Sequence, residues 1–305
     1  MDLISLRYFV EIVRQRSLSK AAVSLGLVQP ALSRRIKLLE EQLGAELLMR
    51  HRRGVEPTET GFLVLERAEL ILRMSEQLED EVRSQAAELI GQVGLGFPPS
   101  IGILFVGRIL SDCIARYPHL KLLLQEDFSP AVRDALLSGR IDIGIMSSEA
   151  QHPDLVGEPL FTESMWLIGR PEDWPFRRRR LGLDKLDRLP IVIGSFTRLL
   201  LERLHARSNF QLRVVAEVDS FTTAIGALRA GAGFLIVPFS SVDRELQKEE
   251  FVGAPLDGFE ITRSLFRHRD RPPTRASTAL TGLIHDEVSR LVSSQPDVFR
   301  RFRAS

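Results

Sequence analysis

The feature that most constrains the fold is a pair of short helical patterns near the start of the chain, SLSKAAVSLGLVQPALSRRI at residues 17–36. Ala21, Ala22 and Leu25 share one face of the first pattern, and Gly26 interrupts it. Pro30 falls in the first turn of the second pattern, where the N–H that proline lacks would have no helical partner. We therefore expect two helices at a steep angle, with the second helix presenting its polar face.

Neighbouring segments complete a small domain around this helix pair. Apolar residues at helical spacing mark the inward faces of an earlier helix and of the second helix of the pair: Leu3, Leu6, Phe9, Val10 and Val13, then Leu32, Ile36 and Leu39. After the pair, RHRRGVEPT at residues 50–58 predicts two short extended arms, with Gly54 at the bend and Pro57 at the end. This pattern is typical of a small β-wing.

A long helical pattern follows. Thr58 can cap its start, and Glu59 falls in its first turn. Apolar or small residues recur in steps of three and four at positions 64, 68, 71, 74, 78, 82, 86 and 89, and no breaker precedes Gly91. Roughly thirty residues make a rod of about 45 Å. A rod with one apolar stripe needs a partner. It is either a core helix of a large domain or a dimerisation helix, and its place between two bodies favours a dimerising linker.

Strand-like and helix-like segments alternate through the rest of the chain. GQVGLGF at residues 91–97 predicts a strand just after a domain boundary, and PAVRDALLSGR at 130–140 predicts a helix with a glycine stop. Further strands are expected at 121–127, 141–146, 164–169, 191–194, 213–218, 234–237 and 261–267. The alternation indicates an α/β body with a largely parallel sheet. Patterning alone is compatible with one domain or with two lobes.

Composition narrows the class of protein. Hydrophobic residues make up 44% of the 305 residues, enough for large cores, and the net charge is +1. The first 60 residues carry ten Arg or Lys against seven Asp or Glu, so the excess of positive charge lies in the small domain. A single cysteine, Cys113, excludes a disulfide framework within the chain. The N-terminus lacks the pattern of a signal peptide, and no stretch has the apolar length of a membrane span. We expect a cytoplasmic protein with no membrane partner.

Signals for an enzyme are weak. The histidines are scattered without metal-ligand spacing, at His51, His119, His152, His205, His268 and His285. Cys113 falls on an apolar helix face, and GAGFLI lacks the third glycine of a dinucleotide fingerprint. We therefore expect no catalytic residue, no metal and no cofactor. A binding protein, or an architectural DNA-binding protein without ligand control, is the other alternative.

The chain resembles the LysR-type transcriptional regulators. The stretch LRYFVEIVRQRSLSKAAVSLGLVQPALSRRIKLLEEQLGAELLMRHRRGVEPTETG carries most of the resemblance, and GQVGLGFPPS, SGRIDIGIM and GAGFLIVP fit the family in order and spacing. RRGVEPTETG and GQVGLGFPPS are weakly similar to the nitrogen-assimilation-control branch. One departure is Val28, where many members carry a Ser or Thr that caps the recognition helix.

The resemblance implies an α/β fold class with three parts. These are a winged helix-turn-helix at 1–58, a dimerising linker helix at 59–90 and an effector domain at 91–305 that is similar to periplasmic binding proteins. Its lobe I would span about 91–163 and 263–305, and its lobe II about 164–262. The family further implies dimers that build tetramers, and activation or repression of promoters in response to a small molecule. The implied partners are double-stranded DNA, the effector and further copies of the chain, with RNA polymerase as a candidate.

The start of the second helix in a helix-turn-helix enters the major groove. The family pattern, with the motif at about Leu18 to Lys37, places Gln29, Pro30, Ser33 and Arg34 at the DNA. Gln can pair with an adenine edge, Arg with guanine, and proline can touch a thymine methyl group. Flanking the wing, three arginines would hold phosphates or reach the minor groove: Arg50, Arg52 and Arg53. The other interpretation of such arginines is a solvated surface, and Arg35 is expected at a phosphate or in solvent.

Ligands of open α/β sheets bind beyond the carboxyl ends of strands, against helix N-termini. Residues that follow predicted strands, most of them polar, are therefore the candidate effector site: Pro99, Ser100, Ser129, Ser147, Ser195, Thr197, Arg198 and Ser220. Hydroxyl and N–H groups favour a small anion, such as a carboxylate. Arg198 is either the source of positive charge or a surface residue, and the serines are either ligands or helix caps.

A second basic run, at residues 177–180, falls in a loop of the predicted body, far in sequence from the reading helix. Four consecutive arginines are compatible with nucleic-acid binding, but a solvated loop or a subunit contact is the interpretation we favour.

Overall fold

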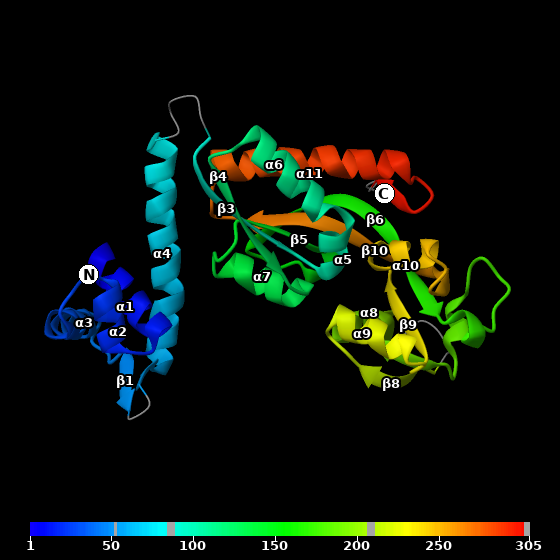
Figure 1. Cartoon of the computed structure of the whole chain (residues 1–305), viewed down its shortest axis with the longest axis horizontal. Coiled ribbons are helices and arrows are strands. Elements are labelled where there is room, and N and C mark those ends of the chain that lie inside the picture. The colour runs from blue at the N-terminus through cyan, green and yellow to red at the C-terminus, as the bar shows by residue number, and fades with distance from the viewer. Residues whose placement is uncertain (52–53, 84–88, 206–210, 302–305) are drawn as a thin grey trace. The chain divides into compact units, whose positions relative to one another are not determined.

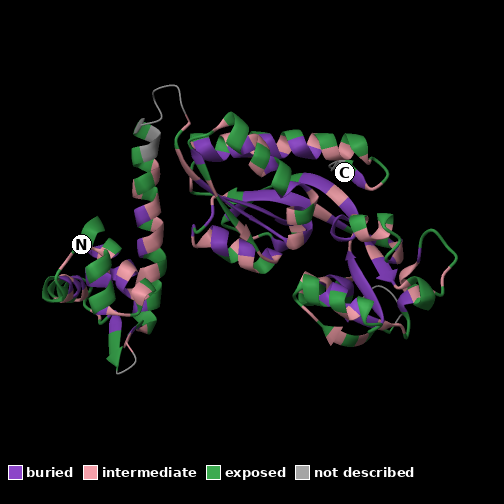
Figure 2. Cartoon of the chain, in the orientation of Figure 1, coloured by how far each residue is buried: buried purple, intermediate pink, exposed green. Residues whose placement is uncertain are grey.

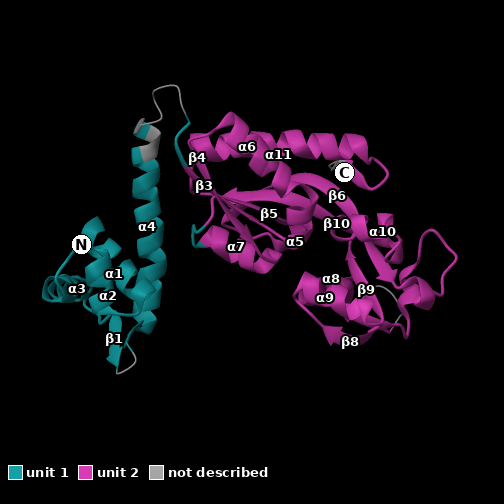
Figure 3. Ribbon diagram, viewed as in Figure 1, with its two compact units in different colours: residues 1–91, 138–140 teal, residues 92–137, 141–305 magenta. Residues whose placement is uncertain are grey.

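The computed structural model describes residues 1–51, 54–83, 89–205 and 211–301 of the chain. The chain divides into two compact units (Figure 3). The first comprises Met1–Gly91 with Ser138–Arg140, and the second comprises Gln92–Leu137 with Ile141–Ser305. Each unit has its own core and is described by itself.

The first unit is three short helices, a hairpin and a long helix (Figure 1). Its elements are α1 (Leu3–Gln15), α2 (Leu18–Ser24), α3 (Gln29–Leu43), β1 (Leu48–His51), β2 (Gly54–Pro57) and α4 (Glu59–Arg83). The β1 and β2 strands pair antiparallel, with His51 opposite Gly54. The wing predicted from the sequence is therefore present, although Gly54 begins the second strand rather than occupying the bend.

Local chemistry begins and ends these helices. The side chain of Asp2 accepts a hydrogen bond from the Ser5 N–H at the start of α1. Gly26, after α2, has a φ of 66°, which is the left-handed backbone that glycine adopts without cost. The predicted inward face of α3 is confirmed, because Leu32, Ile36 and Leu39 are each at most 1% exposed. On α1 the buried residues include the predicted Leu6, Phe9 and Val10, but the prediction is wrong for Leu3, which is 42% exposed in the first turn of the helix.

The long helix α4 is described from Glu59 to Arg83, and the part of the predicted helix at 84–88 falls outside the described residues. It spans 25 residues, a length of roughly 37 Å, and Leu89 and Ile90 lie outside any helix. Thr58 caps α4 as predicted, since its Oγ1 accepts a hydrogen bond from the Gly61 N–H.

The second unit is built on a nine-stranded sheet of order β4-β3-β5-β10-β6-β9-β7-β8, with β11 paired to β6. The strands are β3 (Gly91–Phe97), β4 (Leu120–Glu126), β5 (Ile143–Ser147), β6 (Leu155–Gly169), β7 (Pro190–Ile193), β8 (Arg213–Glu217), β9 (Phe234–Pro238), β10 (Val252–His268) and β11 (Phe299–Arg301). We call the part around β4, β3 and β5 lobe I, and the part around β9, β7 and β8 lobe II.

The prediction of a largely parallel sheet is wrong at its centre. β3 and β5 are parallel in lobe I, and β7 is parallel to both β8 and β9 in lobe II. Between them, β6 and β10 run antiparallel to each other and to β5 and β9. The predicted strands 164–169 and 261–267 are the ends of these two longer strands. Their other halves contain Pro159, Pro255 and Gly258, which mask the strand pattern.

Helices cover the sheet of each lobe, and most strands form the buried centre, whereas β4 and β8 are largely exposed or half-buried (Figure 2). They are α5 (Pro99–Ile101), α6 (Gly107–Arg116), α7 (Ser129–Leu137), α8 (Ser195–His205), α9 (Phe221–Arg229), α10 (Asp243–Gln247) and α11 (Arg275–Ser294). A π-helix at Gly102–Val106 joins α5 to α6. Among the described helices, none has the combination of length and apolarity that crossing a membrane requires.

Two glycine substitutions test the packing of the two units. A Cβ added at Gly61 would overlap the carbonyl oxygen of Leu47, whereas one added at Gly226 in α9 meets nothing within 4 Å. We expect Gly61→Ala to lower the free energy of unfolding of the first unit by about 1–3 kcal/mol. Gly226→Ala should raise that of the second unit by up to about 1 kcal/mol, because alanine is the better helix former. Chemical denaturation followed by circular dichroism measures both, and a stabilising Gly61→Ala would contradict the packing described here.

Candidate functional site

The polar face of α3 begins with three exposed or half-exposed residues, Gln29, Pro30 and Ser33. Val28 makes no side-chain cap at this helix. Another residue supplies a link instead, because the hydroxyl of Ser19 on α2 donates a hydrogen bond of 2.9 Å to Oε1 of Gln29. The amide of Gln29 is thereby held at the start of α3 even though the usual capping residue is missing.

Neighbouring arginines on α3 have different environments. Arg34 is exposed and makes no hydrogen bond or ion pair with another described residue. Arg35 donates to Oδ2 of Asp2 at 2.7 Å, at the start of α1. The pKa of Asp2 is lowered chiefly by the hydrogen bond from the Ser5 N–H, and Arg35 adds to the effect. Arg35 therefore ties α3 to α1 and is not free in solvent.

The wing reaches the same face. Arg50 on β1 donates a hydrogen bond of 3.0 Å from Nη2 to Oγ of Ser33 on α3. Arg50 and Ser33, both predicted to contact DNA, thus lie side by side although they come from β1 and α3. The predictions for Arg52 and Arg53 fall outside the described residues. The polar face of α3 and β1 together form the candidate nucleic-acid surface.

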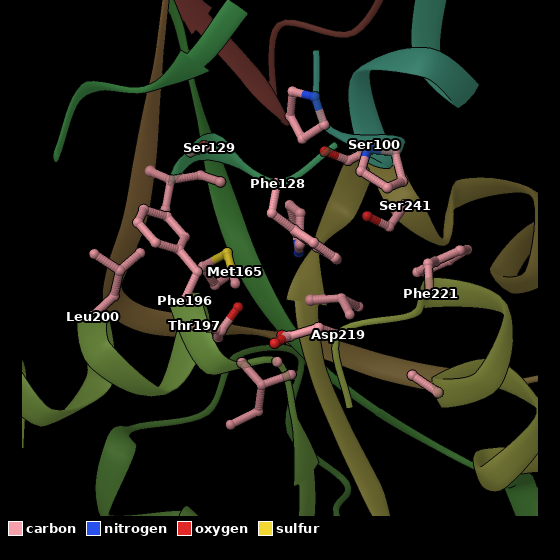
Figure 4. Close-up of a pocket in the computed structure, with 18 of the residues that line it drawn as sticks. Ser100, Phe128, Ser129, Met165, Phe196, Thr197, Leu200, Asp219, Phe221 and Ser241 are labelled. Atoms are coloured by element: carbon pink, nitrogen blue, oxygen red, sulfur yellow. The ribbon is translucent and has the colours of Figure 1, made fainter. Parts of the chain in front are cut away.

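A cavity of about 90 Å³ lies between the two lobes of the second unit (Figure 4). Four of the predicted effector-site residues line it, namely Pro99, Ser100, Ser129 and Thr197. They come from the starts of α5, α7 and α8, which follow strands β3, β4 and β7. The rule that ligands bind beyond the carboxyl ends of strands locates the cavity correctly.

The other predicted hydroxyl residues are not among the lining residues, because they serve the helix and strand ends themselves. Ser147 is fully buried, and its N–H donates to Oγ of Ser129 at 3.2 Å. The N–H and hydroxyl of Ser195 both donate to the Asp219 carboxylate at 2.8 Å. Ser220 caps α9 by accepting from the Thr223 N–H.

Arg198 is not at the cavity either. Its guanidinium bonds to Glu202 at 2.9 Å and to Glu217 at 2.8 Å on the exposed surface of lobe II. The hydrogen bond to Glu202, followed by the one to Glu217, raises the pKa of Arg198. The structure thus favours the surface interpretation of this residue. The basic run at 177–180 is likewise exposed, and Arg180 pairs with Asp257 at 2.7 Å.

The positive charge at the cavity comes from Arg263, which the sequence reasoning missed. Its side chain is 4% exposed, and its Nε–H donates to Oε1 of Glu163 at 2.8 Å. Its Nη2 donates to Oγ of Ser100 at 2.9 Å. The other oxygen of Glu163 accepts from the Ser240 N–H at 3.1 Å. The signal available in the sequence was one arginine inside the apolar strand ITRSLF.

Most of the remaining lining is apolar. Figure 4 shows Phe128, Met165 and Phe196 converging on the same space, with Leu200 and Phe221 at its sides. Among the residues that the structure describes, no group of three or more His, Cys, Asp or Glu could hold a metal ion. The arrangement is that of a compact binding cavity with one cationic end.

Both units match protein families. A family described as bacterial regulatory helix-turn-helix protein, lysR family, matches residues 3–62, and the LysR substrate binding domain matches residues 86–289. The chain is 30% identical over 245 residues to the nitrogen assimilation regulatory protein nac of Klebsiella aerogenes, with 79% of each protein covered. It is 27% identical over 300 residues to the HTH-type transcriptional regulator BbuR of Bordetella bronchiseptica, with 97% of this chain and 92% of the relative covered.

The fold is also that of a solved structure. CbnR, a LysR family transcriptional regulator, superposes with a TM-score of 0.71 at 21% identity, covering 95% of this chain and 99% of CbnR. At that identity the likeness concerns the fold alone. The resemblance expected from the residues is confirmed, including the weak similarity to the nitrogen-assimilation-control branch.

We call the buried pair of Arg263, which lines the cavity, and Glu163, which lies behind the lining and bonds to Arg263, the cavity floor, and this pair gives a test of stability. Glu163→Ala leaves a buried guanidinium without its counter-charge, so we expect the second unit to lose about 3–5 kcal/mol of unfolding free energy. The double variant Glu163→Met/Arg263→Met removes both charges and keeps the volume, so its stability should lie close to that of the parent. Urea denaturation measures both variants. A double variant as unstable as the single one would contradict this account of the pair.

Proposed function

This chain belongs to the LysR family of bacterial transcriptional regulators, and from that premise we propose how its two units divide the work. LysR regulators bind DNA through the helix-turn-helix and respond to small molecules bound by the substrate-binding domain. The protein is such a regulator and not an enzyme. In our proposal the polar face of α3 and the wing read the operator, and the cavity between the lobes takes the effector.

On the DNA side, the proposal assigns base contacts to Gln29, Pro30, Ser33 and Arg34. The observation that carries it is that Arg34 is exposed without a partner among the described residues, while Arg35 is occupied by Asp2. An arginine with a free planar guanidinium can make the bidentate contact with guanine O6 and N7. The proposal assigns contacts with the DNA backbone to the wing arginines, Arg50, Arg52 and Arg53. Contacts with phosphates would make the affinity for DNA strongly dependent on salt.

On the effector side, the proposal assigns a small anion to the cavity. The support is the cationic end formed by Arg263, together with the hydroxyls of Ser100, Ser129 and Thr197 along the lining. Binding would favour one arrangement of the lobes. A change of arrangement follows only if the ligand binds the two states with different affinities.

LysR regulators form oligomers, and we propose that α4 builds the dimer. Its second half exposes a row of large apolar side chains, with Met74 52%, Leu78 62% and Val82 61% exposed. An exposed stripe of this kind on a long helix is covered by a partner. Dimers would then assemble into tetramers in the cytoplasm and activate or repress promoters, where RNA polymerase is a candidate further partner.

Arg34→Ala tests the reading face. Loss of one bidentate base contact should weaken operator binding by about 1–3 kcal/mol and relax the preference at one base pair. Quantitative footprinting on the DNA upstream of the protein's own gene measures the effect, with a genome-wide selection of bound fragments if that region is not protected. Arg14→Ala is the matched control, because Arg14 is an exposed arginine on α1. Equal footprints for the parent and Arg34→Ala would remove Arg34 from the contacts.

Two glutamate substitutions in the exposed apolar row of α4 test the proposed dimer. In Met74→Glu/Leu78→Glu, both side chains are exposed in the single chain, so the fold should survive while association is lost. At about 1.5–3 kcal/mol for each buried apolar side chain, counted on both subunits, the dimer should weaken a hundredfold or more. Sedimentation equilibrium gives the dissociation constant. Glu76→Gln, on the opposite face of the helix, is the control, and an unchanged dimer in the double variant would place the interface elsewhere.

A further inference from the structure

The described lining of the interlobe cavity carries charge at two places only, Arg263 and Asp219. Both oxygens of Asp219 accept hydrogen bonds from Ser195, so this carboxylate serves the start of α8. Arg263 is therefore the single cation that the described lining offers to a ligand, and it is 96% buried.

The guanidinium of Arg263 has donors to spare. An arginine carries five N–H donors. One bonds to Glu163 and one to Ser100, and no other described residue accepts from Arg263. Three N–H donors of a buried cation at the cavity wall therefore lack a protein acceptor. An acceptor brought to these donors makes charge-assisted hydrogen bonds with a guanidinium that is already largely removed from water, so a ligand that supplies one gains affinity.

The charges around Arg263 favour a ligand with one negative group over a ligand with two. Glu163 is fully buried, uses one oxygen for Arg263 and the other for the Ser240 N–H, and is not part of the lining. Its negative charge already offsets Arg263, so a monoanion shares the cation with Glu163. A second carboxylate or a phosphate dianion would lose water without meeting another cation, and Asp219 would repel it more strongly than it repels a monoanion.

The rest of the ligand must be compact and apolar. Beyond the cationic end, the lining is dominated by large apolar side chains, among them Phe128, Met165, Phe196 and Ile236. A volume of about 90 Å³ is of the order of the apolar cavity of about 150 Å³ that holds one benzene molecule. A long or highly hydroxylated ligand would leave polar groups unpaired against these walls.

We propose that the effector is a compact monocarboxylic acid with an aromatic or branched apolar body, whose carboxylate binds the free N–H donors of Arg263. The inference rests on the proposed function, since it names the class of molecule that the cavity binds. It also gives the acid a place where both lobes meet, because Arg263 is bonded to Ser100 in lobe I and, through Glu163, to Ser240 after β9 in lobe II.

Two matched series of probes separate head-group charge from body shape. Phenylacetate, phenylacetamide and phenylmalonate share one ring but are monoanionic, neutral and dianionic at pH 7. Isovalerate, isovaleramide and isopropylmalonate repeat the comparison on a branched aliphatic body. Isothermal titration calorimetry of the full chain gives the affinity of each probe. We expect at least one monocarboxylate to bind at least tenfold more tightly than both its amide and its dianion.

The double variant Glu163→Met/Arg263→Met tests the anchor with the net charge of the protein unchanged. It should lose the preference for acid over amide while still binding the amide, because the apolar walls remain. Arg180→Gln, a surface arginine of lobe II paired with Asp257, is the control for general loss of positive charge and should behave as the parent. Near-ultraviolet circular dichroism confirms that the second unit of each variant is folded, and Glu163→Gln/Arg263→Gln, which also removes both charges, replaces the double variant if that one is not.

The outcomes separate this inference from the proposed function. Tighter binding of a dianion, equal binding of acid and amide, failure of both series to bind, or an acid preference that survives the loss of Arg263 would each overturn the inference. Footprinting in parallel shows whether the same preparation binds DNA. DNA binding without an acid preference leaves the regulator in place and removes the effector class, whereas acid binding that never alters the footprint supports the site and contradicts its regulatory role.

Discussion

The effector domain depends on the pairing of β6 with β10. These two strands run antiparallel from residue 155 to 169 and from 252 to 268, and they are the strands shared by the sheets of both lobes. Each contributes one charged residue to the floor of the cavity, Glu163 and Arg263, and the pairing brings them within 2.8 Å. A buried pair of this kind contributes little net stability, but it is costly to leave half-made. The strand register is therefore tied to the chemistry of the site.

A small aromatic cluster supports the same region. Phe299 of β11 contacts Phe161 of β6 at a centroid distance of 5.6 Å and Phe239 after β9 at 6.1 Å. Phe239 in turn contacts Trp166 on β6. These rings pack β11 and the turn that carries Ser240 onto the strand that carries Glu163, so that apolar packing holds the polar atoms of the floor in place.

In the first unit, unlike the second, the apolar and polar faces of the helices follow from helical spacing alone. The buried face of α3 contains Leu32, Ile36 and Leu39, and the opposite face contains Arg34, as their spacing in the sequence predicts. Contacts between helices then distinguish residues that spacing treats alike. Arg34 and Arg35 are neighbours in the sequence, yet only Arg35 meets Asp2 across the unit.

Sequence reasoning located the interlobe cavity better than it identified the residues that line it. Helix starts that follow strands are visible in the sequence, and Pro99, Ser100, Ser129 and Thr197 do line the cavity. The sequence could not show that the Ser195 hydroxyl is used up by Asp219, which lies 24 residues away, or that Arg198 turns to two surface carboxylates. A hydroxyl or an arginine at a helix start is equally suited to a cap, a surface ion pair or a ligand contact, and only its neighbours decide.

The sequence alone determined the helices and the wing of the first unit, its long helix, and the alternation of strands and helices in the second unit. These features follow from periodicity, from the placement of glycine and proline and from the distribution of charge, which all depend on residues a few positions apart. Tertiary structure alone decided the role of Arg263. Its partners Glu163 and Ser100 lie 100 and 163 residues away in the sequence, and a register shift between Arg263 and Ser264 breaks the two-residue alternation that would assign each side chain to a face. Strand order and register are long-range properties, so the place of Arg263 at the cavity becomes visible only when β6 and β10 are paired.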